Sequence, residues 1–121
     1  MALVSTLELP GSPAEVSSTA PATAFYWNDT AELQTGETLS APVCTILEYD
    51  PRYPLDTEDV TATVQAAGSP AIVASGVNAG DVSVTIKAAS LTAGYEYRVM
   101  LSATGSLGTN PQRYFRIVCK L

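Results

Sequence analysis

The stretch DVSVTIKAASLTAGYEYRVMLSAT, residues 81–104, decides the fold class of this chain. Apolar and polar residues alternate in its first seven positions and again in the run that follows Gly94. Alternation with a period of two residues is typical of β-strands that bury one face. The apolar positions are Val82, Val84 and Ile86 in the first run and Tyr95, Tyr97, Val99, Leu101 and Ala103 in the second. The stretch therefore predicts two strands, at 81–87 and at 94–104.

The same alternation continues on both sides of this stretch. Further strands are predicted at residues 38–47, 60–65, 71–74 and 112–121. Segments rich in glycine, proline and asparagine separate these runs, as turns require. The one candidate for a helical turn is 28–34, where Asn28 is a suitable cap. About seven short strands joined by turns favour an all-β chain folded as a two-sheet sandwich.

The first 24 residues differ in composition from the rest of the chain. Residues 10–24 are mainly proline, serine, alanine and threonine, which bury too little side chain to hold a fold. A loosely alternating apolar run precedes them and supplies candidate partner-binding residues: Leu3, Val4, Leu7 and Leu9. We predict an extended N-terminal arm at 1–24, ordered on a neighbouring subunit, and a sandwich at 25–121. On this prediction, deletion of residues 1–20 leaves the sandwich folded and abolishes partner binding; a frayed terminus is the alternative.

Charge is sparse and unevenly distributed. The chain has 121 residues, enough for one domain, and only 15% of them are charged, whereas about a quarter is usual. The net charge of −6 argues against nucleic acid as a partner, because phosphates need lysine and arginine. Residues 1–86 hold eleven acidic residues and one basic residue, whereas residues 87–121 hold one acidic and five basic residues. This polarity suits contacts between copies in a homo-oligomer, or docking on a charged partner, although a random surface can show the same.

Two features of the sequence bear on location. The start, MALVSTLELPGSPAEV, lacks the basic region of a secretion signal. No run approaches the roughly 20 apolar residues that a membrane span needs. We therefore expect a protein that is made in a cytoplasm and has no membrane partner.

The residue types offer little catalytic chemistry. The sequence has no histidine, which removes the commonest general base and the commonest metal ligand. The remaining candidates are carboxylates in the segment 48–59, namely Glu48, Asp50, Asp56, Glu58 and Asp59. Their spacing matches no EF-hand loop, and a loop on a small sandwich offers no cleft for paired catalytic carboxylates. We expect no enzymatic activity, no cofactor and no metal, with this segment forming a solvated acidic loop.

The cysteines and the loop tyrosines leave alternatives open. Cys44 and Cys119 lie in apolar, strand-like runs, where free thiols behave as small apolar groups; a single disulfide requires an oxidising compartment. Tyr49 and Tyr53, in the loop predicted at 48–59, are candidate partner-binding residues because tyrosine is enriched in protein interfaces. Burial in the core and a role as a sugar-binding platform are the alternatives for these tyrosines.

The stretch from Leu91 to Leu101 resembles the turn into strand F of immunoglobulin-like and fibronectin type III-like domains. In those domains a leucine packs beneath the turn, a glycine permits it, and a tyrosine returns its hydroxyl to the backbone, an arrangement named the tyrosine corner. The resemblance implies these structural roles for Leu91, Gly94 and Tyr97. The tryptophan of the family's strand C has no counterpart, since the single tryptophan is Trp27, so an antibody-type domain is not implied.

The chain as a whole resembles the small immunoglobulin-like proteins encoded among the head and tail genes of tailed bacteriophages. The similarity rests on YWNDTAELQTGETL at 26–39 and on a closing hairpin, YRVMLSAT at 97–104 with RYFRIV at 113–118. It covers residues 25–121. Two segments depart from it, the long loop at 48–59 and GSLG at 105–108, which replaces a short polar turn. The resemblance implies a protein of the virion, foremost a capsid decoration protein that binds the major capsid protein. A tail, neck or baseplate module is the first alternative, and a surface adhesin or carbohydrate-binding module is the second.

Overall fold

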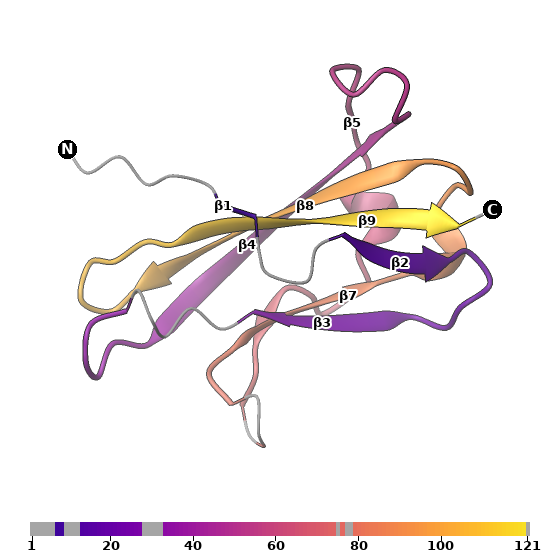
Figure 1. Ribbon diagram of the computed structural model, residues 1–121. Helices are drawn as coiled ribbons and strands as arrows, with labels where there is room; N and C mark the ends of the chain where they lie inside the picture. The colour runs from indigo at the N-terminus through magenta and orange to yellow at the C-terminus, as the bar shows by residue number, and fades with distance from the viewer. Residues whose placement is uncertain (1–6, 9–12, 28–32, 75, 77–78, 121) are drawn as a thin grey trace.

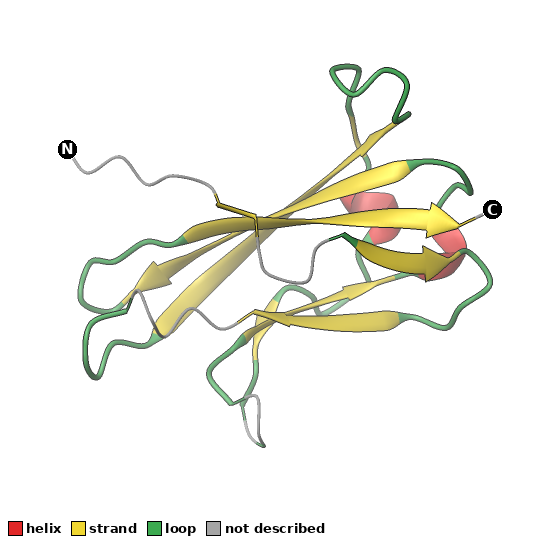
Figure 2. Ribbon diagram, in the orientation of Figure 1, coloured by secondary structure: helices red, strands yellow, loops and turns green. Residues whose placement is uncertain are grey.

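The structure, a computed structural model, describes residues 7–8, 13–27, 33–74, 76 and 79–120. These residues form a nearly all-β chain with two sheets (Figures 1 and 2). The strands are β1 (Leu7–Glu8), β2 (Ala14–Ser17), β3 (Thr23–Trp27), β4 (Leu39–Tyr49), β5 (Glu58–Asp59), β6 (Ala71–Ile72), β7 (Val82–Ile86), β8 (Glu96–Gly105) and β9 (Gln112–Lys120). A single helical turn, α1 (Thr61–Val64), and a 3-10 turn, η1 (Ala88–Ser90), accompany them. The prediction of an all-β chain with two sheets is confirmed at this level.

The two sheets differ in size and in strand direction. The larger sheet has the order β1-β9-β8-β4-β5, with β2 also paired to β9, and the smaller sheet has the order β3-β7-β6. Neighbouring strands run antiparallel, except that β1 and β2 both run parallel to β9. Figure 1 shows the sheets as two layers, with β3 and β7 in the layer opposite β8 and β9.

The core lies between the sheets and consists of the alternating apolar residues that the sequence predicts. In β7, Val82, Val84 and Ile86 are completely buried, and in β8 and β9 buried positions alternate with half-buried ones. Phe25 of β3 meets Phe115 of β9 across the layers, with ring centroids 4.9 Å apart. Removing such apolar area from water, at about 25 cal/mol per Å², is the main favourable term in folding.

Residues 60–65 were a predicted strand, and that prediction is wrong because they contain helix α1. Threonine and valine favour strands, but the backbone turns here. The Asp59 carboxylate accepts hydrogen bonds from the N–H of Thr61, at 3.0 Å, and from its hydroxyl, at 2.6 Å. The turn places Val64 in the core, where it is 1% exposed. Burial in the tertiary structure therefore outweighs the local strand propensity.

The loop predicted at 48–59 is shorter than the sequence suggests. Strand β4 runs on to Tyr49, and β5 pairs with its end through Leu47–Asp59 and Glu48–Glu58. The remaining loop spans residues 50–57. The helical turn predicted at 28–34 falls mostly on residues 28–32, which lie outside the described residues.

The N-terminal segment is not a free arm over its whole predicted length of 1–24. Strand β2 pairs with β9 of the same chain, from Ala14 opposite Ile117 to Ser17 opposite Lys120. Val16 is only 6% exposed and belongs to the core, and β3 begins before residue 25. Composition misleads here because strand pairing uses backbone N–H and C=O groups, which serine, alanine and threonine supply as well as valine does.

Candidate protein-binding site

Tyr97 of β8 makes the contacts that a tyrosine corner requires. Its side chain is completely buried, and its hydroxyl accepts a hydrogen bond from the N–H of Thr92 and donates one to the Glu48 carboxylate, both at 2.6 Å. Leu91 is buried in the same core, and Gly94 turns the chain with a φ of 88°. Burial, helped by the Glu48 carboxylate, raises the pKa of Tyr97 to about 12, so its hydroxyl stays protonated. These residues hold the turn before β8 in place.

The surface best suited to a partner is the outer face of the larger sheet. We define the outer face as the side chains of β4, β8 and β9 that point away from the core. Residues opposite each other in antiparallel strands share a face, so the register arranges these side chains in rows. The rows are Val43–Ser102–Gln112, Thr45–Met100–Tyr114, Leu47–Arg98–Arg116 and Tyr49–Glu96–Val118. Tyrosine, methionine and arginine, which are enriched in protein interfaces, all occur in the two middle rows.

Arg98 lies at the centre of the outer face between two tyrosine rings. Its guanidinium carbon is 5.4 Å from the ring centroid of Tyr49 and 5.9 Å from that of Tyr114, within the range of a cation–π interaction. Arg116 lies opposite Arg98, with its guanidinium 4.0 Å from the Glu96 carboxylate. The two arginines give this face basic character in a chain whose net charge is −6.

Tyr49 is not the exposed loop residue that the sequence predicts. It is the last residue of β4, lies opposite Glu96 and is only 5% exposed. Its hydroxyl donates a hydrogen bond to the Glu96 carboxylate at 3.3 Å. Burial, together with the charge of Glu96, raises the pKa of Tyr49. Tyr49 therefore supports the Arg98 side chain, and its buried ring offers little surface of its own. Its role in partner binding stays a prediction.

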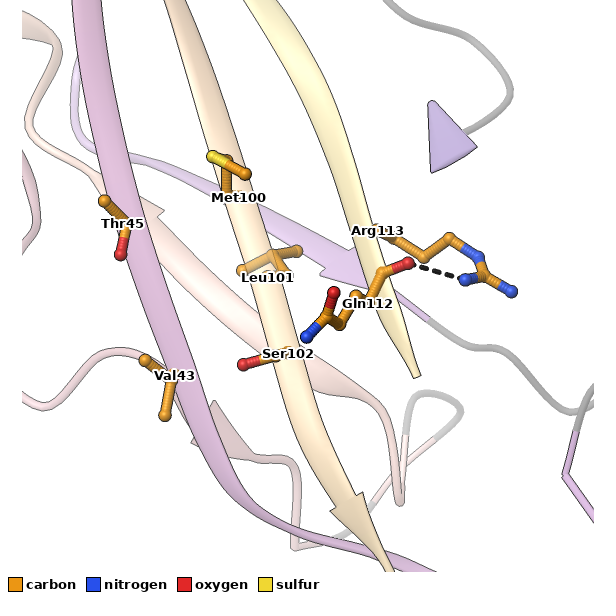
Figure 3. A pocket seen from close by; sticks show the side chains of 7 residues that line it. All are labelled: Val43, Thr45, Met100, Leu101, Ser102, Gln112 and Arg113. Atoms are coloured by element: carbon orange, nitrogen blue, oxygen red, sulfur yellow. Dashed lines mark hydrogen bonds between the residues drawn. The ribbon is translucent and has the colours of Figure 1, made fainter. Parts of the chain in front are cut away.

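A pocket of about 210 Å³ opens on the outer face (Figure 3). Its lining residues are Val43, Thr45, Met100, Leu101, Ser102, Gln112 and Arg113. Val43 and Met100 give it apolar character, and Val43 is 56% exposed. Thr45 of β4, Ser102 of β8 and Gln112 of β9 add hydroxyl and amide groups to the lining. A pocket of this volume has room for a single side chain, as have the pockets at the centre of protein interfaces.

The second surface feature is the acidic loop, which we define as residues 50–59. It projects from the end of β4 (Figure 1), and residues 51–59 are all exposed. Tyr53 is 60% exposed and Leu55 is 94% exposed. Arg52 pairs with Asp50, with 2.7 Å between nitrogen and oxygen, and its hydrogen bonds lower the pKa of that carboxyl. In the described part of the chain, no group of three or more cysteines and carboxylates is placed to hold a metal ion.

Glu37 joins the segment before β4 to the turn between β8 and β9. One carboxylate oxygen accepts a hydrogen bond from the N–H of Gln34 at 3.0 Å, and the other accepts from the N–H groups of Leu107 and Thr109, both at 2.9 Å. Burial of this carboxylate opposes its ionisation, but the backbone donors outweigh that effect and lower the pKa of Glu37 from 4.5 to about 2. Gly105 is needed beside it, since a Cβ there would overlap both the Glu37 carboxylate and the Thr109 carbonyl.

The Glu37 contact is expected to make stability depend on pH. The pKa of Glu37 is about 2 in the folded chain, below the ordinary value of 4.5. The ionised carboxylate therefore stabilises the fold above pH 4.5, and this stabilisation is lost as the pH falls from 4.5 towards 2. Thermal melts at pH 6 and pH 3 should show a larger drop for the native chain than for Glu37→Gln. Equal drops for the two chains would contradict this assignment, because the other carboxylates titrate in both.

Most of the predicted N-terminal binding residues are not placed by the structure. Leu3, Val4 and Leu9 lie outside the described residues. Leu7 belongs to β1, where its backbone pairs in parallel with Arg113. Their role in partner binding therefore stays a prediction.

Both cysteines are free and buried in the core. Burial, with a smaller effect of the Asp59 charge, raises the pKa of Cys44 to about 12. Burial also raises the pKa of Cys119. Both thiols therefore stay protonated and act as small apolar side chains, which agrees with the free-thiol alternative and not with the disulfide.

Comparison with protein-family models, curated proteins and solved structures found no match to this chain. Within the described residues, no helix is long and apolar enough to cross a membrane. The candidate site therefore rests on its own geometry. In the strand predicted at 112–121, Tyr114 and Arg116 alternate with the apolar residues and so face outward, but sequence reasoning missed the rows they form with Arg98 and Met100. The sequence did contain a sign of this face. The outward positions of the strands predicted at 94–104 and 112–121 hold two arginines, a methionine and a tyrosine, the residue types that are enriched in interfaces.

Proposed function

We propose that this chain is a non-enzymatic, immunoglobulin-like protein that binds other proteins, and that it is a capsid decoration protein of a tailed bacteriophage. The binding function rests on one observation, the composition of the outer face. Tyrosine, methionine and arginine side chains occupy adjacent rows there beside a pocket of about 210 Å³. Binding surfaces are enriched in these residue types, and a partner's anchoring side chain fills a pocket of this kind.

The strand order supports the immunoglobulin-like class. In that class strands B, E and D share one sheet and strands C, F and G share the other. The orders β3-β7-β6 and β4-β8-β9 correspond to B-E-D and C-F-G. The hydrogen bond from the Thr92 N–H to the Tyr97 hydroxyl then lies at the corner between strands E and F, where a tyrosine corner is expected. One difference is that β2 pairs with β9, whereas the first strand of the constant-type domain joins strand B.

The assignment to a phage virion rests on the sequence resemblance alone. The two resembling segments, 26–39 and the closing hairpin at 97–118, are joined by Glu37. Its carboxylate accepts hydrogen bonds from Leu107 and Thr109 in the turn of that hairpin. Leu107 and Thr109 lie in the turn between the two resembling strands, so this contact connects segment 26–39 to the hairpin without involving the hairpin's resembling residues.

Quantitative mass spectrometry of purified virions tests this proposal. In particles of the phage whose genome encodes this chain, a decoration protein should be present in numbers comparable to the major capsid protein. Isolated tails should then lack it. A copy number of only one or a few rings would assign the chain to the tail, neck or baseplate instead. Absence from the particle would refute the virion assignment.

A further inference from the structure

Leu55 in the acidic loop is the most exposed of the large apolar side chains in the described residues, at 94%. Single exposed apolar side chains are common on protein surfaces. Here, however, Tyr53 is exposed two positions before it, and Asp56, Glu58 and Asp59 follow within four positions. The loop therefore presents one apolar side chain that is flanked by negative charge.

The outer face has the complementary chemistry. Its pocket offers the apolar side chains of Val43 and Met100. Arg98 precedes Met100 by two residues on the same face of β8, and Arg116 lies opposite Arg98. Two residues along a strand span roughly 7 Å, so an apolar side chain in the pocket brings neighbouring carboxylates within reach of the guanidinium groups.

The acidic loop does not reach the pocket of its own chain. The loop starts after Tyr49, whereas Thr45 of the pocket lies four residues earlier on β4, roughly 13 Å back along the strand. Figure 1 shows the loop projecting beyond the end of the larger sheet, at the opposite end from the start of β9. Gln112 of the pocket is the first residue of β9. Leu55 and the carboxylates beside it therefore lie away from the pocket of their own chain, and a second copy can supply them to it.

We propose that copies of this chain associate head to tail, with Leu55 of one copy in the outer-face pocket of the next. Glu58 of the first copy then pairs with Arg98 of the second, and Asp56 pairs with Arg116. This inference rests on the proposed use of the outer face for protein contacts, but not on the virion assignment. Because the two contacting surfaces differ, such copies form a closed ring or an open chain.

The contact is expected to be weak and sensitive to salt. One loop on one face buries less area than a permanent dimer interface does. Charge pairs at a surface are screened as the ionic strength rises. Association should therefore be visible at high protein concentration in dilute buffer and should decline as NaCl is added.

Sedimentation velocity of the purified full chain over a range of concentrations tests the inference. Leu55→Ser and Arg98→Glu should each weaken association by about tenfold or more, as loss of a central contact does. Adding Glu58→Arg to Arg98→Glu should restore it in part, because the charge pair is re-formed with opposite sign. The matched controls are Leu107→Ser, an apolar residue 53% exposed in another loop, and Lys87→Glu, an exposed charge elsewhere. Thermal melts show whether each variant remains folded.

Two results would overturn the inference. One is a native chain that stays monomeric at every concentration and salt level. The other is equal weakening by Leu55→Ser and Leu107→Ser. If the native chain is monomeric and Arg98→Glu nevertheless removes it from virions, the outer face binds a different protein. That outcome rejects self-association and leaves the proposed function standing.

Discussion

Replacing Tyr97 by alanine is expected to lower the free energy of unfolding by about 4 kcal/mol, because truncating a buried aromatic side chain costs roughly 3–5 kcal/mol. The ring is completely buried in the core. The substitution also leaves the Thr92 N–H and the Glu48 carboxylate without the hydroxyl that they contact at 2.6 Å. Urea denaturation followed by tryptophan fluorescence measures the loss, since Trp27 lies in the same core.

Tyr97→Phe separates the hydroxyl from the ring. It keeps the buried ring and is expected to cost about 1–3 kcal/mol, the penalty for leaving a buried hydrogen-bonding group unsatisfied. Tyr53→Phe is the matched control, since Tyr53 is 60% exposed and surface substitutions usually stay within about 0.5 kcal/mol. If Tyr97→Phe is as stable as the native chain, the hydrogen bonds of the Tyr97 hydroxyl do not stabilise the turn, which contradicts the assignment of a tyrosine corner.

Deletion of residues 1–20 is expected to destabilise the chain by at least about 2 kcal/mol, the value of burying one valine side chain. The deletion removes Val16 from the core and β2 from the edge of β9. The exposed N–H and C=O groups of β9 then form an open sheet edge, which promotes pairing with other chains. Urea denaturation and size-exclusion chromatography should show lower stability together with aggregation. The composition of the segment predicted the opposite, a truncated chain that stays folded.

Two point variants separate the core contact of β2 from its surface contact. Val16→Ser should reproduce much of the loss, because it places a hydroxyl in the core. Glu15→Gln should cost little, since the ion pair between Glu15 and Lys120 is exposed, with side chains 61% and 57% accessible. Full stability of the truncated chain would show that β2 does not contribute to the fold and that the predicted arm is correct.

Strands with one buried face were predictable from the sequence. Strands held in place mainly by backbone hydrogen bonds to a neighbouring strand were not. The strands at 81–87, 94–104 and 112–121 were found because each has one face in the core, which imposes a period of two on the sequence. In β2 only Val16 reaches the core, so four residues give no periodic signal. Helix α1 was missed because its threonines and valine have a high propensity for strands. The hydrogen bond between Thr61 and Asp59 that starts the turn depends on the direction of the backbone at this point, which the residue types do not show.

The candidate site was only partly predictable for a related reason. Tyr53 was expected at the surface from its place in a polar loop, and it is exposed. Tyr49 was assigned to the same loop, but pairing with Glu96 extends β4 and buries it. Contacts between Arg98, Tyr49 and Tyr114 depend on the register of three strands that are distant in sequence. No local pattern specifies that register.

The parallel pairing of β2 with β9 has a consequence for how the chain is made. Residues 14–17 pair with residues 117–120, so β2 has no partner until about a hundred further residues have been synthesised. Closing a loop that long costs conformational entropy before any contact offsets it, which slows folding. During synthesis the early strand is available to chaperones and to other nascent chains.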